Sequence, residues 1–143
     1  MFYEQRTTVP DSPADLRAEY EDDLRAVVDR QGPDTVAGRT DVDRETATAL
    51  LEGDSPALTL PEAAEIQSLA EGEPDPDEMV TIACEHLLLG MSTAVLDVDA
   101  IESELELDLD AKEIQQKIER RAPMTLEEYV HVQYVIADGM STA

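Results

Sequence analysis

The cationic and amide side chains that could contact DNA are concentrated in one short segment near the end of the chain. Both lysines and two of the eight arginines lie within residues 112–121. Residues 1–110 have a net charge of −23, whereas residues 111–121 have a net charge of +2. Glutamine can pair with adenine through two hydrogen bonds, and arginine and lysine bind guanine or phosphate. The candidate DNA-binding residues are Lys112, Gln115, Gln116, Lys117, Arg120 and Arg121.

The same cations also have a purely structural interpretation. Lysine and arginine near the C-terminal end of a helix stabilise the helix dipole. They also form ion pairs with acids three or four residues away. Both interpretations fit the sequence, and they differ in whether the cations of residues 111–121 face solvent.

Four acidic residues have part of the spacing of a calcium-binding loop, but the pattern is incomplete. They are Asp41, Asp43, Glu45 and Glu52. Thr46 occupies the position at which such a loop needs glycine for a sharp turn, and the surrounding residues have a helical pattern. We therefore expect a structural cluster of acids here and no metal site.

The remaining reactive side chains are sparse. His86 and His131 lie in apolar segments without a cysteine or second histidine at ligand spacing, which favours packing roles. Cys84 is the only cysteine, so the chain cannot form an internal disulfide, and a reducing compartment is expected. No nucleophile motif or phosphate-binding loop is recognisable. We expect a protein that is not an enzyme and has no cofactor.

The charge of the chain predicts adaptation to concentrated salt. Thirty-four Asp and Glu residues face only ten Lys and Arg, for a net charge of −24 over 143 residues. Salt screens the resulting repulsion. An alternative is an acidic protein that binds a basic partner at ordinary salt. The 42% hydrophobic content argues against a disordered acidic chain and is enough for a core.

The location predicted from the sequence is the cytoplasm, without a membrane association. Residues 1–13 lack the basic and apolar pattern of a signal peptide. The most apolar stretch, Met79–Val98, is interrupted by Glu85, His86 and Asp97. Charged side chains are costly inside a bilayer, so this stretch is expected to lie within the protein.

Hydrophobic periodicity and helix caps predict an all-α fold, a compact helical domain preceded by a flexible arm at residues 1–12. Only five aromatic residues are present, so aliphatic side chains must fill the core. Three capping boxes are predicted at Thr59, Asp110 and Thr125. The expected helices span residues 13–31, 34–40, 43–52, 60–71, 79–98, 99–106, 111–121 and 125–137.

Two segments of the chain suggest an internal repeat. TLPEAAEIQSLAEG, which begins at Thr59, aligns with TLEEYVHVQYVIADG, which begins 66 residues later at Thr125. The neighbouring helices follow in the same order, and the helix around Leu24 aligns with the one around Met91. We predict two units of similar architecture, at residues 13–72 and 75–139.

Both units resemble the helix-turn-helix of Cro and phage repressors. The first resemblance lies in DTVAGRTDVDRETATALLEGDSPALTLPEAAEI, with Asp41 in the turn; the second lies in AKEIQQKIERRAPMTLEEY. The turn of the second unit is expected to be about two residues longer. The resemblance implies a DNA-binding transcriptional regulator or nucleoid-associated protein, a dimer, that places helix 111–121 in the major groove of double-stranded DNA.

The chain as a whole is similar to a family of small, acidic, functionally uncharacterised haloarchaeal proteins. The stretches that carry this similarity are SPADLR, HLLLGMSTAVLDVD and KEIQQKIERRAPMTLEEY. The similarity spans nearly the full length. It implies a salt-adapted, halophilic lineage and a shared fold, without implying an activity.

The sequence therefore supports two functional hypotheses from different classes. The first is DNA binding through helix 111–121. The second is a helical protein-interaction module, such as an accessory or antitoxin-like subunit, that contacts a protein partner or a second copy of itself through the apolar helix 79–98. The two hypotheses place the functional surface on different helices.

Overall fold

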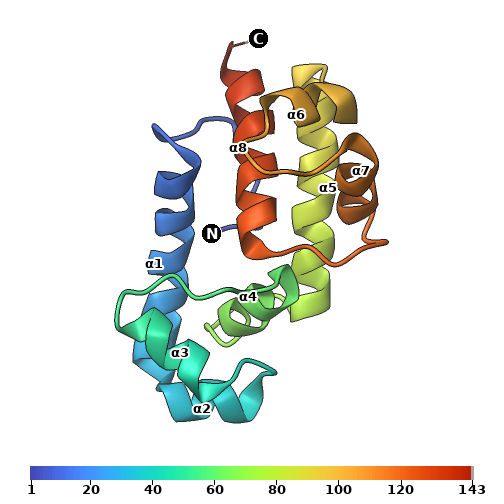
Figure 1. The fold of residues 1–143 in the computed structure, drawn as a ribbon. Helices are drawn as coiled ribbons and strands as arrows, with labels where there is room; N and C mark the ends of the chain where they lie inside the picture. The colour runs from blue at the N-terminus through green and yellow to red at the C-terminus, as the bar shows by residue number, and fades with distance from the viewer. Residues whose placement is uncertain (143) are drawn as a thin grey trace.

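The computed structural model describes residues 1–142, with side chains for residues 1–140. The described chain is helical, and a single isolated β-bridge is its only extended pairing, so the predicted all-α fold is confirmed. Figure 1 shows three long helices standing side by side, with shorter helices around them. The elements are α1 (Pro13–Gln31), α2 (Pro33–Arg39), α3 (Arg44–Leu51), α4 (Leu60–Gln67), α5 (Pro76–Ala94), α6 (Val98–Glu104), α7 (Ala111–Ile118) and α8 (Leu126–Thr142).

The three predicted capping boxes are present and set the starts of α4, α7 and α8. In each, a threonine or aspartate accepts a hydrogen bond from the backbone N–H three residues later, and the glutamate at that position accepts one in return. These bonds satisfy donors that the first turn of a helix leaves unpaired. The pairs are Thr59–Glu62, Asp110–Glu113 and Thr125–Glu128.

Four helices end three or more residues away from the sequence prediction. The structure ends α4 at Gln67, α5 at Ala94 and α7 at Ile118, earlier than predicted, and continues α8 to Thr142. Gly139 was expected to follow the end of α8, but the helix continues through it. A Cβ at Gly139 would lie 3.0 Å from the side chain of Leu96, so this glycine permits close packing instead of ending the helix.

The core lies between α1, α4, α5 and α8. Large side chains from each helix are fully buried there, including Leu24 of α1, Leu87 of α5 and Tyr129 of α8. The helices α5 and α8 approach closely at Gly90, where an added Cβ would lie 2.7 Å from Cγ2 of Ile136. This contact fixes which face of α5 is inside and which faces solvent.

The N-terminal segment is packed against the helices, which corrects the prediction of a flexible arm. Phe2 is 1% exposed and makes edge-on ring contacts with Tyr20 and Tyr129. The Tyr129 hydroxyl donates to the Phe2 carbonyl at 2.6 Å, and Gln133 Nε2 donates to the same oxygen at 3.4 Å. The segment is ordered by these buried contacts, because they satisfy polar groups inside the core while burying a large ring.

The same order of helices occurs twice along the chain. In the first half, the long helix α1 is followed by the short helices α2 and α3 and by α4, which begins with a capping box. In the second half, the long helix α5 is followed by the short helices α6 and α7 and by α8, which also begins with a capping box. The two closing helices meet at their starts, where Leu60 N–H donates to the Met124 carbonyl and Leu126 N–H donates to the Leu58 carbonyl, both at 2.9 Å. The bounds of α1 and α5 align Leu24 with Leu87, one turn before the Met91 alignment expected from the sequence. These features support an internal repeat.

Within the described residues, no single helix combines the length and the apolar content needed to cross a membrane. The helices α5 and α6 meet the same criteria only when taken together, and a bend of 91° separates them.

Candidate functional site

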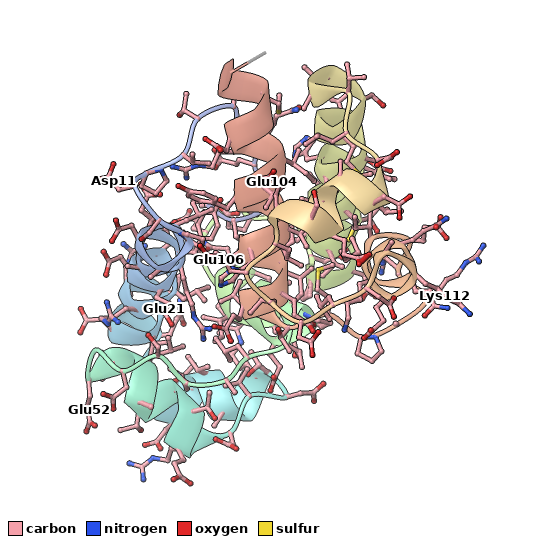
Figure 2. All side chains as sticks on the ribbon, turned by 45° about the horizontal axis from the view of Figure 1, so that its top comes forward. Asp11, Glu21, Glu52, Glu104, Glu106 and Lys112 are labelled. Carbon is pink, nitrogen blue, oxygen red and sulfur yellow. The ribbon has the colours of Figure 1, made fainter. Side chains whose placement is uncertain are left out.

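The candidate DNA-binding helix is α7, and only part of its predicted surface is available. Ile114 and Ile118 are buried, so they fix the rotation of the helix against the body. Lys112 and Gln115 are exposed on the outer side, and Gln116 is half-buried. Figure 2 shows Lys112 at the edge of the molecule, pointing outward.

Lys117 does not belong to the outer surface of α7. Its side chain is only 15% exposed, and its Nζ lies 3.0 Å from Glu128 Oε1. The same ammonium donates to the Pro123 carbonyl at 2.7 Å. This lysine connects α7 to the start of α8, and its charge is neutralised there. Lys117 therefore has a structural role, as the alternative interpretation of these cations predicted.

The two arginines of the predicted strip lie beyond the end of α7. The Nε of Arg121 lies 3.4 Å from Glu119 Oε1. Gln115 Nε2 donates to the other carboxylate oxygen of Glu119, at 3.1 Å. Arg120 points to a different element, since its guanidinium donates to the hydroxyl of Thr81 in α5. The six predicted residues therefore do not form one continuous cationic face.

Asp41 lies in the turn of the first predicted helix-turn-helix and does not have a left-handed backbone, since among the described non-glycine residues only Val95 and Arg120 have a positive φ. The turn between α2 and α3 spans residues 40–43, and the one between α6 and α7 spans residues 105–110, so the predicted two-residue difference is present.

The acids with partial calcium-loop spacing serve the helix instead. Asp43 caps α3, and its carboxylate accepts a hydrogen bond from Thr46 N–H at 2.7 Å. Hydrogen bonds from the backbone and side chain of Thr46 lower the pKa of Asp43. Glu45 lies within α3, and Glu52 caps its C-terminal end.

The two histidines pack at different places on the helical body. His86 Nδ1 lies 2.8 Å from the carbonyl oxygen of Tyr3, so this ring helps to hold the N-terminal segment against α5. His131 is half-buried in α8 and lies beside a hollow that also includes Glu106 and Tyr134. These positions agree with the packing roles expected from the sequence.

The sequence did not reveal an apolar groove between α5, α6 and α7, which we call the α5–α7 groove. It has a volume of about 800 Å³ and an apolar floor. Leu88 and Val95, which line it, are 47% and 89% exposed. The apolar composition of α5 was visible in the sequence, but which leucines face solvent depends on its packing against α8. The lining residues are Leu88, Met91, Ser92, Val95, Leu96, Asp97, Val98, Gln115, Ile118 and Glu119.

Two helix ends in the second half carry side chains where the first half has glycine. Gly32 ends α1 with φ +90°, and Val95 ends α5 with φ +57°. Gly53 follows α3 with φ +93°, and Arg120 follows α7 with φ +65°. Glycine adopts this left-handed conformation without strain, whereas other L-residues lose about 1 kcal/mol or more. Both exceptions therefore carry a conformational cost that the matching positions avoid.

A model of a family of unknown function, DUF5791, matches residues 16–139. The chain belongs to DUF5791. No curated protein and no solved structure matches the chain. The DUF5791 span includes both left-handed side chains, Val95 and Arg120, and begins after the docked N-terminal segment that contains Phe2. The membership agrees with the expected similarity to an uncharacterised family.

Proposed function

We propose that this protein is a helical protein-interaction module that holds a positively charged, amphipathic helix of a partner protein in the α5–α7 groove. The observation that carries this proposal is Val95, a β-branched residue in a left-handed conformation with 89% of its surface exposed. Such a residue contributes little to the fold and strains the backbone. Strained backbone conformations concentrate at functional sites, where the side chain has a use of its own.

The chemistry of the groove suits the apolar face of a helix. Leu88 comes from α5, Val98 from α6 and Ile118 from α7, so three helices form the walls. Exposed apolar grooves of this kind bind amphipathic helices through residues spaced three or four positions apart.

The charge of the groove favours a basic partner over a second copy of the chain. The charged side chains that line it are Asp97 and Glu119, both acidic. The whole chain carries a net charge of −24, and Figure 2 shows acids on several elements, among them Glu21, Glu104 and Glu106. Two such surfaces repel one another, whereas a lysine-rich helix is attracted to the rim.

DNA is the competing macromolecule, and the observed geometry favours it less. Lys117 is paired with Glu128, Arg121 lies beside Glu119, and Arg120 is directed to Thr81. A helix in the major groove passes phosphates on both sides, so it requires free cations there.

The test uses a synthetic helix of leucine and lysine, with leucines on one face, titrated into the protein at a salt concentration where the protein is folded. A matched peptide with glutamate in place of lysine reports the contribution of charge. We expect the leucine–lysine helix to bind and the leucine–glutamate helix to bind at least tenfold more weakly. The difference should shrink as salt rises, because screening weakens the contribution of charge.

A pair of neighbouring leucines separates the groove from general electrostatic attraction. Leu88 lines the groove, while Leu89 is 52% exposed and lies outside the groove lining. Leu88→Ser should weaken binding of the leucine–lysine helix, whereas Leu89→Ser should leave it unchanged. Equal affinity for parent and Leu88→Ser contradicts the proposal. Binding of genomic DNA fragments that weakens as salt rises and is lost in Lys112→Glu would replace it with DNA binding.

A further inference from the structure

A second hollow, between the start of α4, α5 and the segment that joins α7 to α8, combines an apolar floor with a cationic rim. We call it the Arg120 pocket. It has a volume of about 410 Å³, within the range of sites for small organic molecules. The floor contains Leu60, Val80, Cys84 and Met124, which are buried. Its complete lining is Leu60, Pro61, Val80, Cys84, Lys117, Arg120, Arg121, Ala122, Pro123 and Met124.

The charged side chains that line the Arg120 pocket are all cationic, in a protein with a net charge of −24. Two of the three already have carboxylate partners, since Lys117 pairs with Glu128 and Arg121 lies beside Glu119. Arg120 differs from them. Among the described residues no carboxylate lies within ion-pair distance of it, and its guanidinium donates a hydrogen bond to the neutral hydroxyl of Thr81. Arg120 is thus the lining cation of this pocket without an ion pair, and on its other side it borders a hollow lined by Asp41, Glu65, Asp75 and Asp77.

The backbone at Arg120 indicates that its side chain is required at this place. Its φ of +65° is left-handed, a conformation that glycine adopts without strain. The matching residue of the first half is Gly53, and a Cβ there would meet no atom within 4 Å. Glycine is therefore not needed at position 53 to avoid a steric clash. Strained backbone concentrates at functional sites, so this strain points to a use of the guanidinium beyond its hydrogen bond to Thr81.

We propose that the Arg120 pocket binds a small molecule with one carboxylate and an apolar chain. The guanidinium of Arg120 receives the carboxylate through two parallel hydrogen bonds, the geometry for which arginine is suited. The apolar chain lies on the floor formed by Leu60, Val80 and Cys84. A single free cation matches one negative charge, and the apolar floor excludes a small, strongly hydrated anion such as inorganic phosphate.

The floor contains a reporter for this site. Cys84 is the only cysteine of the chain and is 4% exposed. Burial raises the pKa of its thiol, and the positive charge of Arg120 acts in the opposite direction. An occupied pocket covers the thiol further, so a bound carboxylate should slow its alkylation by a neutral maleimide.

The experiment titrates octanoate, octanol and inorganic phosphate into the full chain by calorimetry, at one salt concentration that keeps it folded. We expect octanoate to bind and to slow alkylation of Cys84. Octanol should bind at least tenfold more weakly, because it lacks the charge, and phosphate should not bind. Arg120→Gly should reduce octanoate affinity tenfold or more, since one charge-assisted pair is lost.

Arg39→Gln is the matched control, because it removes an exposed cation from α2 with the same change in net charge. It should bind octanoate like the parent. Unchanged octanoate affinity in Arg120→Gly, binding of phosphate in preference to octanoate, or no binding of octanoate at all each overturns the proposal. The inference is independent of the α5–α7 groove, because Leu88→Ser leaves the Arg120 pocket intact.

Discussion

Arg120 occupies at the end of α7 the place that Gly53 occupies at the end of α3. Both residues have a positive φ and follow a glutamate that caps the helix. Their backbone hydrogen bonds also correspond, each running back to a carbonyl of the last turn. These bonds are Gly53 N–H to Leu50 O, Asp54 N–H to Ala49 O, Arg120 N–H to Lys117 O and Arg121 N–H to Gln116 O. The two halves therefore end a short helix with the same motif and different residues.

Exchanging these residues should have opposite effects on stability. Arg120→Gly removes left-handed strain from an exposed residue, so we expect the free energy of unfolding to rise by about 1 kcal/mol. Gly53→Ala introduces the same strain and should lower it by about 1 kcal/mol. Urea unfolding at one fixed salt concentration measures both. A destabilised Arg120→Gly variant would show that the arginine supports the fold instead of a ligand.

The docked N-terminal segment should contribute substantially to stability. Phe2 is buried between Tyr20 and Tyr129, so Phe2→Ala leaves a cavity and should lower the free energy of unfolding by about 3–5 kcal/mol. Gln5→Ala changes an exposed residue of the same segment and should have an effect within about 0.5 kcal/mol. Similar stabilities for the two variants would contradict the docking of Phe2 and favour the flexible arm that the sequence predicted.

Stability should fall in alkaline solution because buried tyrosines must ionise on unfolding. Burial is the main cause that raises the pKa of Tyr20 to about 12, and burial also raises the pKa of Tyr129. Tyrosine in an unfolded chain ionises near its ordinary pKa of about 10. The contribution of Tyr20 is therefore complete below pH 10 and is lost as the pH rises from about 10 to about 12. Its size is about 3 kcal/mol.

Tyr20→Phe tests the source of this pH dependence. Tyr20 donates a hydrogen bond to Gln133 Oε1, so the variant has a lower stability at neutral pH. Its stability should decline less steeply than that of the parent between pH 10 and 12. Parallel declines in urea unfolding experiments at several pH values would assign the effect to other groups.

The net charge predicts a strong dependence of stability on salt. Ten cations cannot compensate 34 carboxylates, even with ion pairs such as Arg17–Glu21 and Arg6–Glu19. Raising KCl from about 0.1 M to about 2 M shortens the screening length from about 10 Å to below 3 Å. We expect the melting temperature to rise steadily over this range. A protein that is fully folded at low salt, with an unchanged melting temperature, contradicts salt adaptation.

Local signals in the sequence predicted where helices begin better than where they end or which of their side chains face solvent. A capping box needs two residues three positions apart, so Thr59, Asp110 and Thr125 were recognisable directly. The end of α7 could not be recognised in this way. Arginine is a good helix former, so the sequence gives no sign of the left-handed conformation at position 120.

Contacts between distant segments explain the remaining differences. Lys117 belongs by its spacing to the outer face of α7, yet Glu128 of the next helix draws it into an ion pair. Phe2 lies far in sequence from Tyr129, whose hydroxyl binds its carbonyl. The α5–α7 groove exists because Gly90 brings α5 against α8 and turns Leu88 outward. None of these relationships is encoded in a local pattern.

Val95→Gly tests the proposed function most directly, because it separates binding from folding. Glycine relieves the left-handed strain at the end of α5 and removes an exposed apolar side chain from the α5–α7 groove. We predict a variant about 1 kcal/mol more stable than the parent. It should bind the leucine–lysine helix at least several-fold more weakly in the same calorimetric titration. Undiminished binding by the stabilised variant would contradict the account.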